Sequence, residues 1–479
     1  MMSEDLDQGG AWRRARASRL AFLIDIEAYY TAVYEALRAA RRSILLLGWG
    51  FDPRSRLFPD GLEGPSDPDE IGNILVDIAE RRPEVDIRLL IWRSALPISA
   101  SQEFFPHRAR SWFAGTRVRF LLDDQVPFGA CHHQKVLVID DRIAFCGGAD
   151  ISVDRWDTPS HLDDEPRRIM PAQTFHDARH EVMTIVEGEA AAAFGDLARE
   201  RWRRACGHAL AVPEAVASDP WPASVPAALR DVDVAIARTE PRWKGREGVS
   251  EILASYLQMI AAAQDTIYLE NQYFASPTIC EALARRLAEP DGPEIVLMST
   301  GQSPSWFDRM TMDRARASLI WRLKAADVFG RFRAYYPTTP NGEAIIVHSK
   351  VATFDDAVAR VGSANLNNRS GGFDTECDLI VEASDLDDRM VVSTFRNRLV
   401  GHFIGVTGDA VARACADRGG LIAAIEALDA DGRLQRIEPH AMGRIGTFIA
   451  THHLGDPATV QDSWRLHRRR ERLYGRLSA

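Results

Sequence analysis

The stretch that decides the fold reads His133-Gln134-Lys135, then Asp140 after four further residues, then the pair Gly147-Gly148. The same order of residues returns in the second half of the chain as His348-Ser349-Lys350, Asp355 and Gly362-Ser363. Apolar, strand-like segments surround both copies, and helix-like patterns lie outside these segments. The sequence therefore predicts an internal duplication, with one structural unit built around each copy.

Strands and helices are predicted to alternate in the same order in both halves. In the first half, helical patterns over 27–41 and 70–82 precede apolar strands over 44–47 and 85–92. In the second half, helical patterns over 250–263 and 278–288 precede strands over 267–269 and 295–300. This alternation predicts an α/β fold class, with two lobes and mostly buried sheets.

A proline-rich stretch separates the two copies. The range 212–233 contains Pro213, Pro220, Pro222 and Pro226, a density typical of a linker or a crossing loop. We therefore expect an N-terminal lobe over 1–220, a C-terminal lobe over 221–400 and a helical extension over 401–479 without a counterpart in the first half. One large domain with an irregular loop is the alternative.

Composition narrows the class of protein. The 479 residues carry a net charge of −10, with 46% hydrophobic and 26% charged residues, as in ordinary globular proteins. The acidic balance argues against a nucleic-acid partner. No apolar run approaches the length of about 18 residues that a membrane span needs, and the N-terminus lacks the apolar core of a signal peptide, so we expect a cytoplasmic location.

Cysteine and histidine spacing gives no metal signature. The six cysteines form no CxxC pair, so we expect reduced thiols, and no cluster has the spacing of metal ligands. Neither a metal nor another cofactor is expected.

Lysine is scarce, and its positions are informative. Only four of the 58 basic residues are lysine, namely Lys135, Lys244, Lys324 and Lys350. Two of the four belong to the duplicated motif. Arginine has a planar fork and cannot imitate a compact ammonium group, so these two positions are expected to need lysine itself.

The duplicated motif suits chemistry at phosphorus. If each motif lies in a strand, His133 and Lys135 share one face, as do His348 and Lys350, whereas Asp140 and Asp355 face the other side as structural anchors. One neutral imidazole can attack phosphorus while the other protonates the leaving oxygen and then activates water. The lysines can neutralise phosphoryl oxygens without a metal, and glycines such as Gly147, Gly148 and Gly362 allow close backbone approach.

These residues resemble the phospholipase D superfamily, whose signature is a duplicated HxKx4D followed by Gly-Gly or Gly-Ser. Further runs narrow the resemblance, among them Gly147-Gly148-Ala149-Asp150, Glu270-Asn271-Gln272-Tyr273-Phe274 and Gly362-Ser363-Ala364-Asn365. They are most similar to the eukaryotic-type, phosphatidylcholine-hydrolysing members and their bacterial relatives. The resemblance implies two pseudo-twofold-related α/β/α lobes with the active site at their interface.

The resemblance also implies roles for individual residues. His133 would be the nucleophile and His348 the general acid and base, with Lys135, Lys350 and Asn365 binding phosphoryl oxygens. An acidic residue downstream of each motif would orient the opposite histidine: Glu376 in the second half and Glu181 in the first, with Asp177 as the alternative to Glu181. Ser363, like the motif glycines and aspartates, would be structural.

One position departs from the pattern. Many members of the superfamily carry asparagine where this chain has Asp150, and an anion there would repel phosphate. We expect an arginine or backbone donors to hold Asp150.

The implied function is a metal-independent phospholipase D that hydrolyses the distal phosphodiester of a glycerophospholipid through a phosphohistidine. A phosphatidyltransferase of the cardiolipin synthase type is the first alternative and a nuclease the second. A scaffold that binds phospholipid without turnover is a fourth reading.

Aromatic segments such as Trp306-Phe307 and the loop at Phe128 could form an apolar rim at a peripheral membrane surface, although packing inside the fold is the alternative. The arginine-rich tail over 464–477 could bind anionic lipid or dock as a helix.

Overall fold

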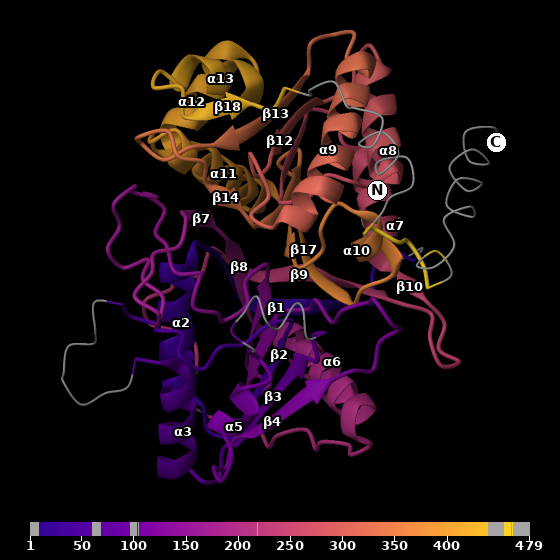
Figure 1. The fold of residues 1–479 in the computed structure, drawn as a ribbon. Coiled ribbons are helices and arrows are strands. Elements are labelled where there is room, and N and C mark those ends of the chain that lie inside the picture. The colour runs from indigo at the N-terminus through magenta and orange to yellow at the C-terminus, as the bar shows by residue number, and fades with distance from the viewer. Residues whose placement is uncertain are drawn as a thin grey trace.

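The computed structural model describes residues 9–59, 69–95, 103, 105–217, 219–438, 455–460 and 462. Two lobes lie against each other, the first drawn in indigo to magenta and the second mainly in orange (Figure 1). Strands and helices alternate in both lobes around one large mixed sheet. The predicted α/β class is therefore confirmed.

The first lobe contributes one half of the sheet. Its strands are β1 (Arg13–Ile24), β2 (Ser43–Gly48), β3 (Asp86–Trp92), β4 (Arg119–Asp123), β5 (Val136–Ile139), β6 (Ile143–Gly147) and β8 (Val182–Gly188). Its helices are α2 (Ile26–Ala39), α3 (Ile71–Arg81), α5 (Ala109–Trp112) and α6 (Glu189–Cys206). The short strand β7 (Arg179–His180) lies outside the large sheet.

The second lobe repeats this arrangement and extends it. Its strands are β9 (Leu229–Glu240), β10 (Val249–Ser250), β11 (Thr266–Asn271), β12 (Glu294–Met298), β13 (Phe332–Pro337), β14 (Ile346–Val347), β15 (Lys350–Phe354), β16 (Val358–Gly362), β17 (Glu376–Glu382) and β18 (Leu434–Arg436). Its helices are α7 (Glu251–Ala262), α8 (Pro277–Ala288), α9 (Trp306–Ala326), α10 (Asn368–Gly372), α11 (Leu386–Phe403), α12 (Gly408–Arg418) and α13 (Leu421–Leu428).

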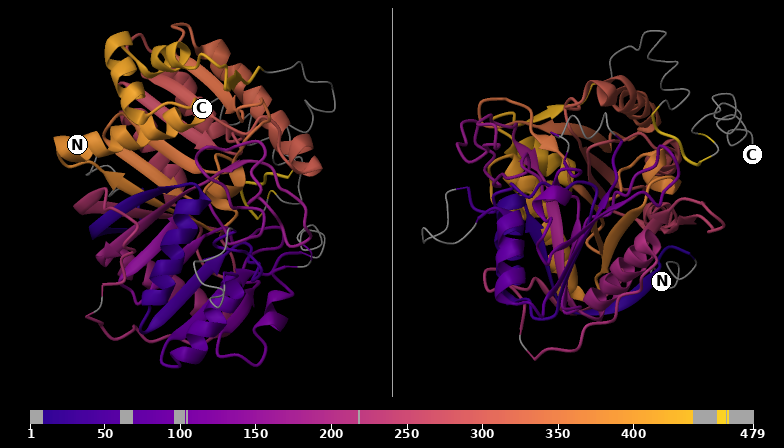
Figure 2. Two further views of the ribbon diagram at one scale, coloured as in Figure 1. Left: turned by 90° about the vertical axis from the view of Figure 1, so that its left-hand side faces the viewer. Right: turned by 60° about the horizontal axis from the view of Figure 1, so that its bottom comes forward.

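The strand order shows the duplication directly. The sheet runs β18-β13-β12-β11-β15-β16-β17-β9-β1-β8-β6-β5-β2-β3-β4. Counted outward from the central antiparallel pair β9–β1, the strands from β17 to β13 correspond one by one to those from β8 to β4. The outer strands β2, β3 and β4 of the first lobe run parallel to one another, as do β11, β12 and β13 of the second lobe. A pseudo-twofold axis therefore passes between β1 and β9, and the sheet continues through both lobes (Figure 2).

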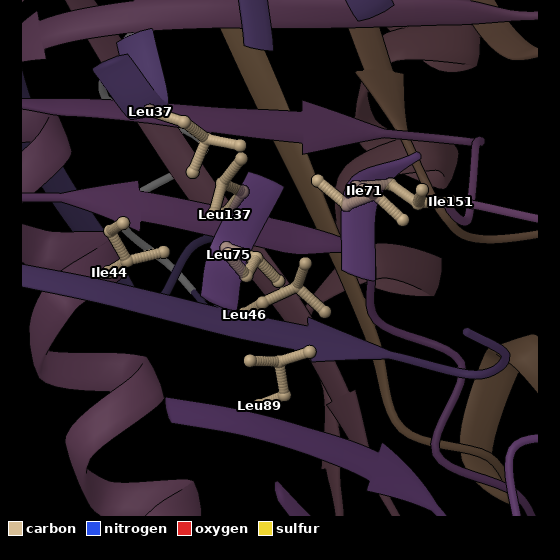
Figure 3. A pocket seen from close by; sticks show the side chains of 8 residues that line it. All are labelled: Leu37, Ile44, Leu46, Ile71, Leu75, Leu89, Leu137 and Ile151. Carbon is tan, nitrogen blue, oxygen red and sulfur yellow. The ribbon is translucent and has the colours of Figure 1, made fainter. Parts of the chain in front are cut away.

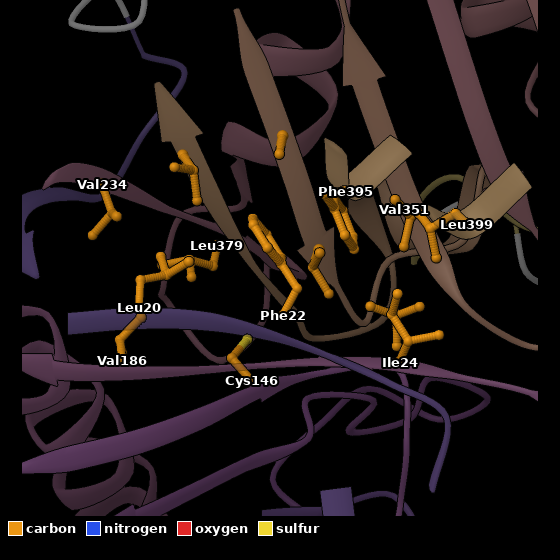
Figure 4. Packing of buried hydrophobic residues seen from close by; sticks show 14 of the residues in the cluster. Leu20, Phe22, Ile24, Cys146, Val186, Val234, Val351, Leu379, Phe395 and Leu399 are labelled. Carbon is orange, nitrogen blue, oxygen red and sulfur yellow. The ribbon is translucent and has the colours of Figure 1, made fainter. Parts of the chain in front are cut away.

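The core on one face of the sheet belongs to both lobes. Side chains alternate along β1, so that Leu20, Phe22 and Ile24 enter this core while Leu23 enters the core beneath α2 and α3. Phe22 stacks on Phe395 of α11 with ring centroids 3.9 Å apart (Figure 4). This packing holds a helix of the second lobe against a strand of the first.

The first lobe also contains a purely apolar gap between α2, α3 and the sheet. It is lined by eight aliphatic side chains and has no room for a water molecule (Figure 3). The lining residues are Leu37, Ile44, Leu46, Ile71, Leu75, Leu89, Leu137 and Ile151. The gap is a feature of core packing and carries no chemistry.

The two central strands differ from the sequence-based expectation. β1 lies in an N-terminal stretch where no strand is expected from the sequence, and the expected linker over 212–233 overlaps the start of β9 at Leu229. The charged residues in the first half of β1 obscure its strand pattern in the sequence, because the residues that pair with them lie far along the chain. Arg14 pairs with Glu382 at 2.8 Å, and Arg16 pairs with Asp233 at 3.0 Å.

The region after the second lobe is helical only in part. α11 begins before residue 401, α12 and α13 lie beyond it, and β18 adds a strand to β13. The division at residues 220 and 400 stays a prediction, and the arginine-rich tail lies outside the described residues. Within the described part of the chain, no helix combines the length and apolarity needed to cross a bilayer.

Candidate active site

His133 lies at the boundary between the lobes and is held by residues of the other lobe. Its backbone N–H donates to the carbonyl of Thr375 at 2.9 Å. Its Nδ1 lies 3.0 Å from Oε2 of Glu376, at the start of β17. The first-motif histidine is thus oriented by the acidic residue of the second half.

His348 has the mirror-image arrangement. Its backbone N–H donates to the carbonyl of His180 at 2.9 Å, and β14 pairs in parallel with β7 just before it. Its Nδ1 lies 2.7 Å from Oε1 of Glu181. Asp177, the alternative to Glu181, is exposed at the surface, so Glu181 is the acid that reaches this histidine.

These cross-lobe bonds change one expectation about local structure. His133 and Lys135 precede β5, which begins at Val136, and His348 precedes β15, which begins at Lys350. The prediction that each histidine lies within a strand of the large sheet is therefore wrong. The backbone at each histidine bonds instead to the segment that carries the opposite glutamate.

Hydrogen bonding indicates the tautomer of His133. Its Nδ1 lies 3.0 Å from the carbonyl oxygen of Ser363, which can only accept, so Nδ1 carries the proton. Nε2 then keeps its lone pair. Burial and the charges of Lys135 and Lys350 hold the pKa of His133 below its ordinary value, which favours the neutral imidazole.

The two glutamates are buried deeper than the histidines they orient. The side chains of His133 and His348 are 15% and 11% exposed, whereas those of Glu376 and Glu181 are 1% and 0% exposed. Burial raises the pKa of Glu376 to about 8, although hydroxyl groups of Ser363 and Ser370 donate to its carboxyl group at 2.5 and 2.6 Å.

Arg155 and Asp25 support Glu181. The Arg155 guanidinium lies 3.3 Å from Oε1 of Glu181, and Oδ1 of Asp25 accepts the Glu181 backbone N–H at 3.1 Å. A Cβ at Gly148 would lie 3.0 Å from Oε2 of Glu181 and 3.2 Å from the carbonyl oxygen of His348. Glycine at this position therefore lets the two lobes approach closely.

The two motif lysines have different surroundings. Lys135 Nζ lies 3.0 Å from Oδ2 of Asp150, whose other oxygen accepts the backbone N–H groups of Trp49 at 2.8 Å and Gly50 at 3.1 Å. Backbone donors and a lysine thus hold Asp150, and no arginine bond to it is found among the described residues. The carboxylate balances the charge of Lys135.

Among the described residues, no carboxylate lies at bonding distance from Lys350 in the way that Asp150 lies beside Lys135. Its Nζ donates to the carbonyl of His348 and lies 3.3 Å from the Nδ1 of that residue. Burial lowers the pKa of Lys350 to about 7, and the nearby charge of Lys135 adds to the effect. A bound phosphoryl anion would restore the ammonium form, because an opposite charge favours it.

Asn365 has a buried side-chain oxygen that is not used in hydrogen bonds within the described fold. Its backbone N–H donates to Oγ of Ser370, the serine that also bonds Glu376. Its side-chain Oδ1 is buried and accepts no hydrogen bond from any residue that the structure describes. Such an atom is costly to bury unless something else binds there.

The motif aspartates anchor loops at equivalent places. Asp140 accepts the backbone N–H groups of Arg41, Arg42 and Ser43 at 2.7–2.8 Å. Asp355 accepts those of Gln264, Asp265 and Thr266, the closest at 2.8 Å. Each aspartate thus ties its motif to the turn before β2 or β11, away from the histidines.

The remaining motif glycines allow close packing between neighbouring strands. A Cβ at Gly147 would lie 2.6 Å from the carbonyl oxygen of Val182, and one at Gly362 would lie 2.0 Å from Oδ1 of Asp378. Ser363 Oγ donates to Glu376, so it belongs to the polar network around His133.

The sequence predicts no cluster of metal-ligating residues, and the structure corrects this. Asp25, His161, His180 and His402 each present one ligand atom, and all four atoms lie within 4.8 Å of one another. The cluster borders the active site, because His180 immediately precedes Glu181 in the chain and Asp25 accepts the backbone N–H of Glu181. Spacing rules cannot find it, because its members come from the end of β1, a loop, β7 and α11.

Two family models match this sequence. The one described as phospholipase D covers residues 36–280, and the one described as cardiolipin synthase, PLD-like domain, covers residues 256–397. The chain belongs to the phospholipase D superfamily.

Relatives and solved structures agree with this membership. Phospholipase D1 of Saccharomyces cerevisiae is 25% identical over 471 residues, covering 76% of this chain and 27% of the yeast protein. Phospholipase D2 of Bos taurus is 21% identical over 472 residues, covering 76% of this chain and 49% of the bovine protein. The chain thus spans half or less of the length of these two relatives.

A phosphatidylserine synthase from Haemophilus influenzae has the same overall fold, with a TM-score of 0.54 at 11% identity. The match covers 100% of this chain and 98% of that one. The two-lobed, pseudo-twofold fold expected from the superfamily resemblance is therefore confirmed.

Proposed function

We propose that this member of the phospholipase D superfamily is a phospholipase D. It hydrolyses the distal phosphodiester of a glycerophospholipid to phosphatidic acid and a free alcohol. The crossed arrangement of His133 with Glu376 and His348 with Glu181 carries the proposal, because it brings two oriented imidazoles to one boundary. Lys135, Lys350 and the unpartnered Oδ1 of Asn365 supply polar groups next to them.

The first half-reaction uses His133 as the nucleophile. Its Nε2 lone pair attacks phosphorus, an N–P bond forms and the bond from phosphorus to the head-group oxygen breaks. His348 gives its Nε2 proton to that oxygen. Burial and the charge of Lys350 hold the pKa of His348 below its ordinary value in the free protein, so the imidazolium depends on Glu181 and on the bound phosphodiester anion. The lysines balance the charge on the phosphoryl oxygens.

The second half-reaction reverses these roles. His348, now neutral, takes a proton from water, and the hydroxyl oxygen attacks phosphorus as the N–P bond breaks. Phosphatidic acid leaves, His133 is again neutral, and His348 is again protonated. Lysine provides the positive charge throughout, so the chemistry at phosphorus uses no metal ion.

Exposed aromatic side chains support a membrane surface as the place of action. Phe128 is 77% exposed, Trp306 is 74% exposed and Phe307 is 55% exposed. By contrast, Phe113 is buried in the core of the first lobe, and the half-buried side chain of Trp112 packs against that core, so these two rings belong to the fold. The three exposed rings suit peripheral contact with lipid.

A phosphatidyltransferase of the cardiolipin synthase type is the second candidate. The match of residues 256–397 to the cardiolipin synthase model favours it. The chemistry is the same until an alcohol takes the place of water at the phosphohistidine.

Product analysis distinguishes these functions. The purified protein is incubated with vesicles of mixed phospholipids, with and without glycerol or phosphatidylglycerol, and lipids are identified by mass spectrometry. Phosphatidic acid and free head-group alcohol are expected without added alcohol. A predominant phosphatidyl-alcohol product would favour the transferase. Vesicle binding without any product, or cleavage of nucleic acid alone, would overturn the proposal.

A further inference from the structure

The cluster formed by Asp25, His161, His180 and His402 contributes no reacting group to the chemistry proposed above, although Asp25 accepts the backbone N–H of Glu181. The side chains of Asp25, His161 and His180 are fully buried. Nδ1 of His180 lies 2.8 Å from Oδ1 of Asp25, and Nε2 of His161 lies 3.5 Å from Oδ2 of the same residue. The ring of His402 lies against that of His180, with centroids 4.7 Å apart.

Several polar atoms in this cluster form no hydrogen bond within the described part of the chain. They include Oδ2 of Asp25 and Nε2 of His161. The ring nitrogens of His402 are also buried, and a contact with the carbonyl of Arg398 accounts for at most one of them. Buried polar atoms of this kind are rare, because leaving them unpaired costs stability.

A protonated His180 would explain only part of the arrangement. Such an imidazolium could bond Asp25 on one side and Glu270, at 3.0 Å, on the other. It would leave Nε2 of His161 and the ring of His402 unexplained. A metal ion would satisfy all four residues at once.

The outer contacts of the cluster are those of metal-bound histidines. Nδ1 of His161 lies 2.9 Å from Oδ2 of Asp157, so its Nε2 is the atom that faces Asp25. Nε2 of His180 lies 3.0 Å from Glu270, so its Nδ1 faces Asp25. Histidine ligands of metals ordinarily donate their other ring nitrogen to a carboxylate in this way.

We propose that Asp25, His161, His180 and His402 bind one divalent transition-metal ion, with zinc as the preferred metal. Three imidazoles and one carboxylate supply four ligand atoms of the kinds that zinc binds, and four protein ligands suit the closed, four-coordinate geometry of a structural zinc site. Ligand atoms around zinc lie roughly 3.3 Å apart when the zinc–nitrogen distance is about 2.0 Å. The distances of 2.8 Å from Oδ1 of Asp25 to His180 and of 3.5 Å from Oδ2 of Asp25 to His161 fall on either side of this value, and the four ligand atoms, which lie within 4.8 Å of one another, would draw together around the ion.

The site joins the two lobes. Three ligands come from the first lobe, whereas His402 comes from α11 of the second, and α11 is drawn just above β7 and β14 in Figure 1. The carbonyl of His180 also accepts the backbone N–H groups of His348 and Ser349. The bound ion therefore fixes the two bonded segments that carry Glu181 and His348, while it takes no part in the reaction at phosphorus.

Metal content tests this inference independently of enzymatic activity. The full-length protein is expressed with zinc in the medium, and its metals are quantified by mass spectrometry. One zinc ion per chain is expected. Cobalt in its place should give the visible absorption bands of a tetrahedral site.

Two ligand variants and one control complete the experiment. His402→Phe keeps a ring in the aromatic cluster, and Asp25→Asn keeps the acceptor oxygen for Glu181; each should lower zinc affinity by more than the 10- to 100-fold typically lost when an outer-shell partner is removed. His208→Ala, on the surface, should keep full occupancy. Circular dichroism checks that each variant folds.

Zinc should also raise the melting temperature of the wild-type protein and leave that of His402→Phe unchanged. Wild-type protein without stoichiometric metal, and without stabilisation by zinc, cobalt or manganese, would overturn the inference. Equal metal content in the ligand variants and the control would overturn it as well.

Discussion

Oε2 of Glu376 lies 3.0 Å from Nδ1 of His133, although 243 residues separate them in the chain. Glu181 and His348 repeat this contact at 2.7 Å. Each lobe thus supplies one histidine and the acid that orients the histidine of the other lobe. Neither half of the duplication can hold a complete pair by itself, so the site depends on the pairing of the lobes.

The two histidines are expected to behave differently in a trapping experiment. With a substrate whose leaving alcohol is very acidic, His348→Ala should form the phosphatidyl adduct on His133 and then stall, because no base activates water. His133→Ala should form no adduct. Intact-protein mass spectrometry after a rapid quench at neutral or alkaline pH measures this, since phosphohistidine is acid-labile.

The reverse pattern, with an adduct only in His133→Ala, would exchange the two roles. No adduct in either variant would indicate direct attack by water.

Lys350→Arg should lose activity by about 100-fold, because a misplaced reacting group can cost that much even when charge is kept. Lys350 is 1% exposed, and a Cβ at Gly148 would lie only 3.5 Å from its Cδ, so the longer, planar side chain shifts the charge. Lys324→Arg, at an exposed ion pair with Glu438, is the control. Turnover near the wild-type value in Lys350→Arg would remove Lys350 from the site.

Asp150→Asn should destabilise the protein by about 3 kcal/mol, because it leaves the buried charge of Lys135 without a partner. The side chains of Lys135 and Asp150 are 3% and 2% exposed, whereas Arg93 and Asp124 form a comparable pair that is more than half exposed. Asp124→Asn should therefore cost less than about 1 kcal/mol.

Urea unfolding measures both variants. Inorganic phosphate should restore more stability to Asp150→Asn than to the wild-type protein, since an anion replaces the lost charge. Unchanged stability in Asp150→Asn would show that the ion pair contributes nothing.

Stability should fall with rising pH because of Glu376. Burial raises its pKa to about 8 from an ordinary value of 4.5, so the folded protein holds a proton that the unfolded chain has released. This contribution is complete below the unfolded pKa and is lost as pH rises toward the folded pKa, with a slope of at most about 1.4 kcal/mol per pH unit.

The measurement is the free energy of unfolding between about pH 5 and pH 8 for the wild-type protein and Glu376→Gln. The variant should lose this slope, and Glu84→Gln, on the surface, should keep it. Parallel curves for all three proteins would contradict the assignment.

Addition of EDTA at the start of an assay should leave the initial rate unchanged, because the lysines supply the charge at phosphorus and a buried structural ion leaves slowly. The rate is measured with and without chelator on the same vesicles. Immediate loss of activity that magnesium or calcium restores at the phosphorus step would contradict the metal-free chemistry. An effect of calcium on vesicle binding alone would not.

The duplicated motif by itself predicted the class of fold, which the structure confirms, and it supplied the candidate histidines and lysines of the site. Apolar periodicity marked most strands of each lobe, because a buried strand shows its pattern within a few residues. The assignment of Asp140 and Asp355 as anchors also follows from spacing, and the structure shows both bonded to backbone donors in the turns before β2 and β11.

Only the tertiary structure decided between Glu181 and Asp177 as the acid that reaches His348, and only it showed that Asp150 balances Lys135. It alone revealed the central strands β1 and β9 and the cluster around Asp25. These relationships join residues from different lobes or distant loops, so they depend on the register of the shared sheet. A local sequence pattern carries information only about residues within one turn or one strand, so it does not identify partners that lie far along the chain.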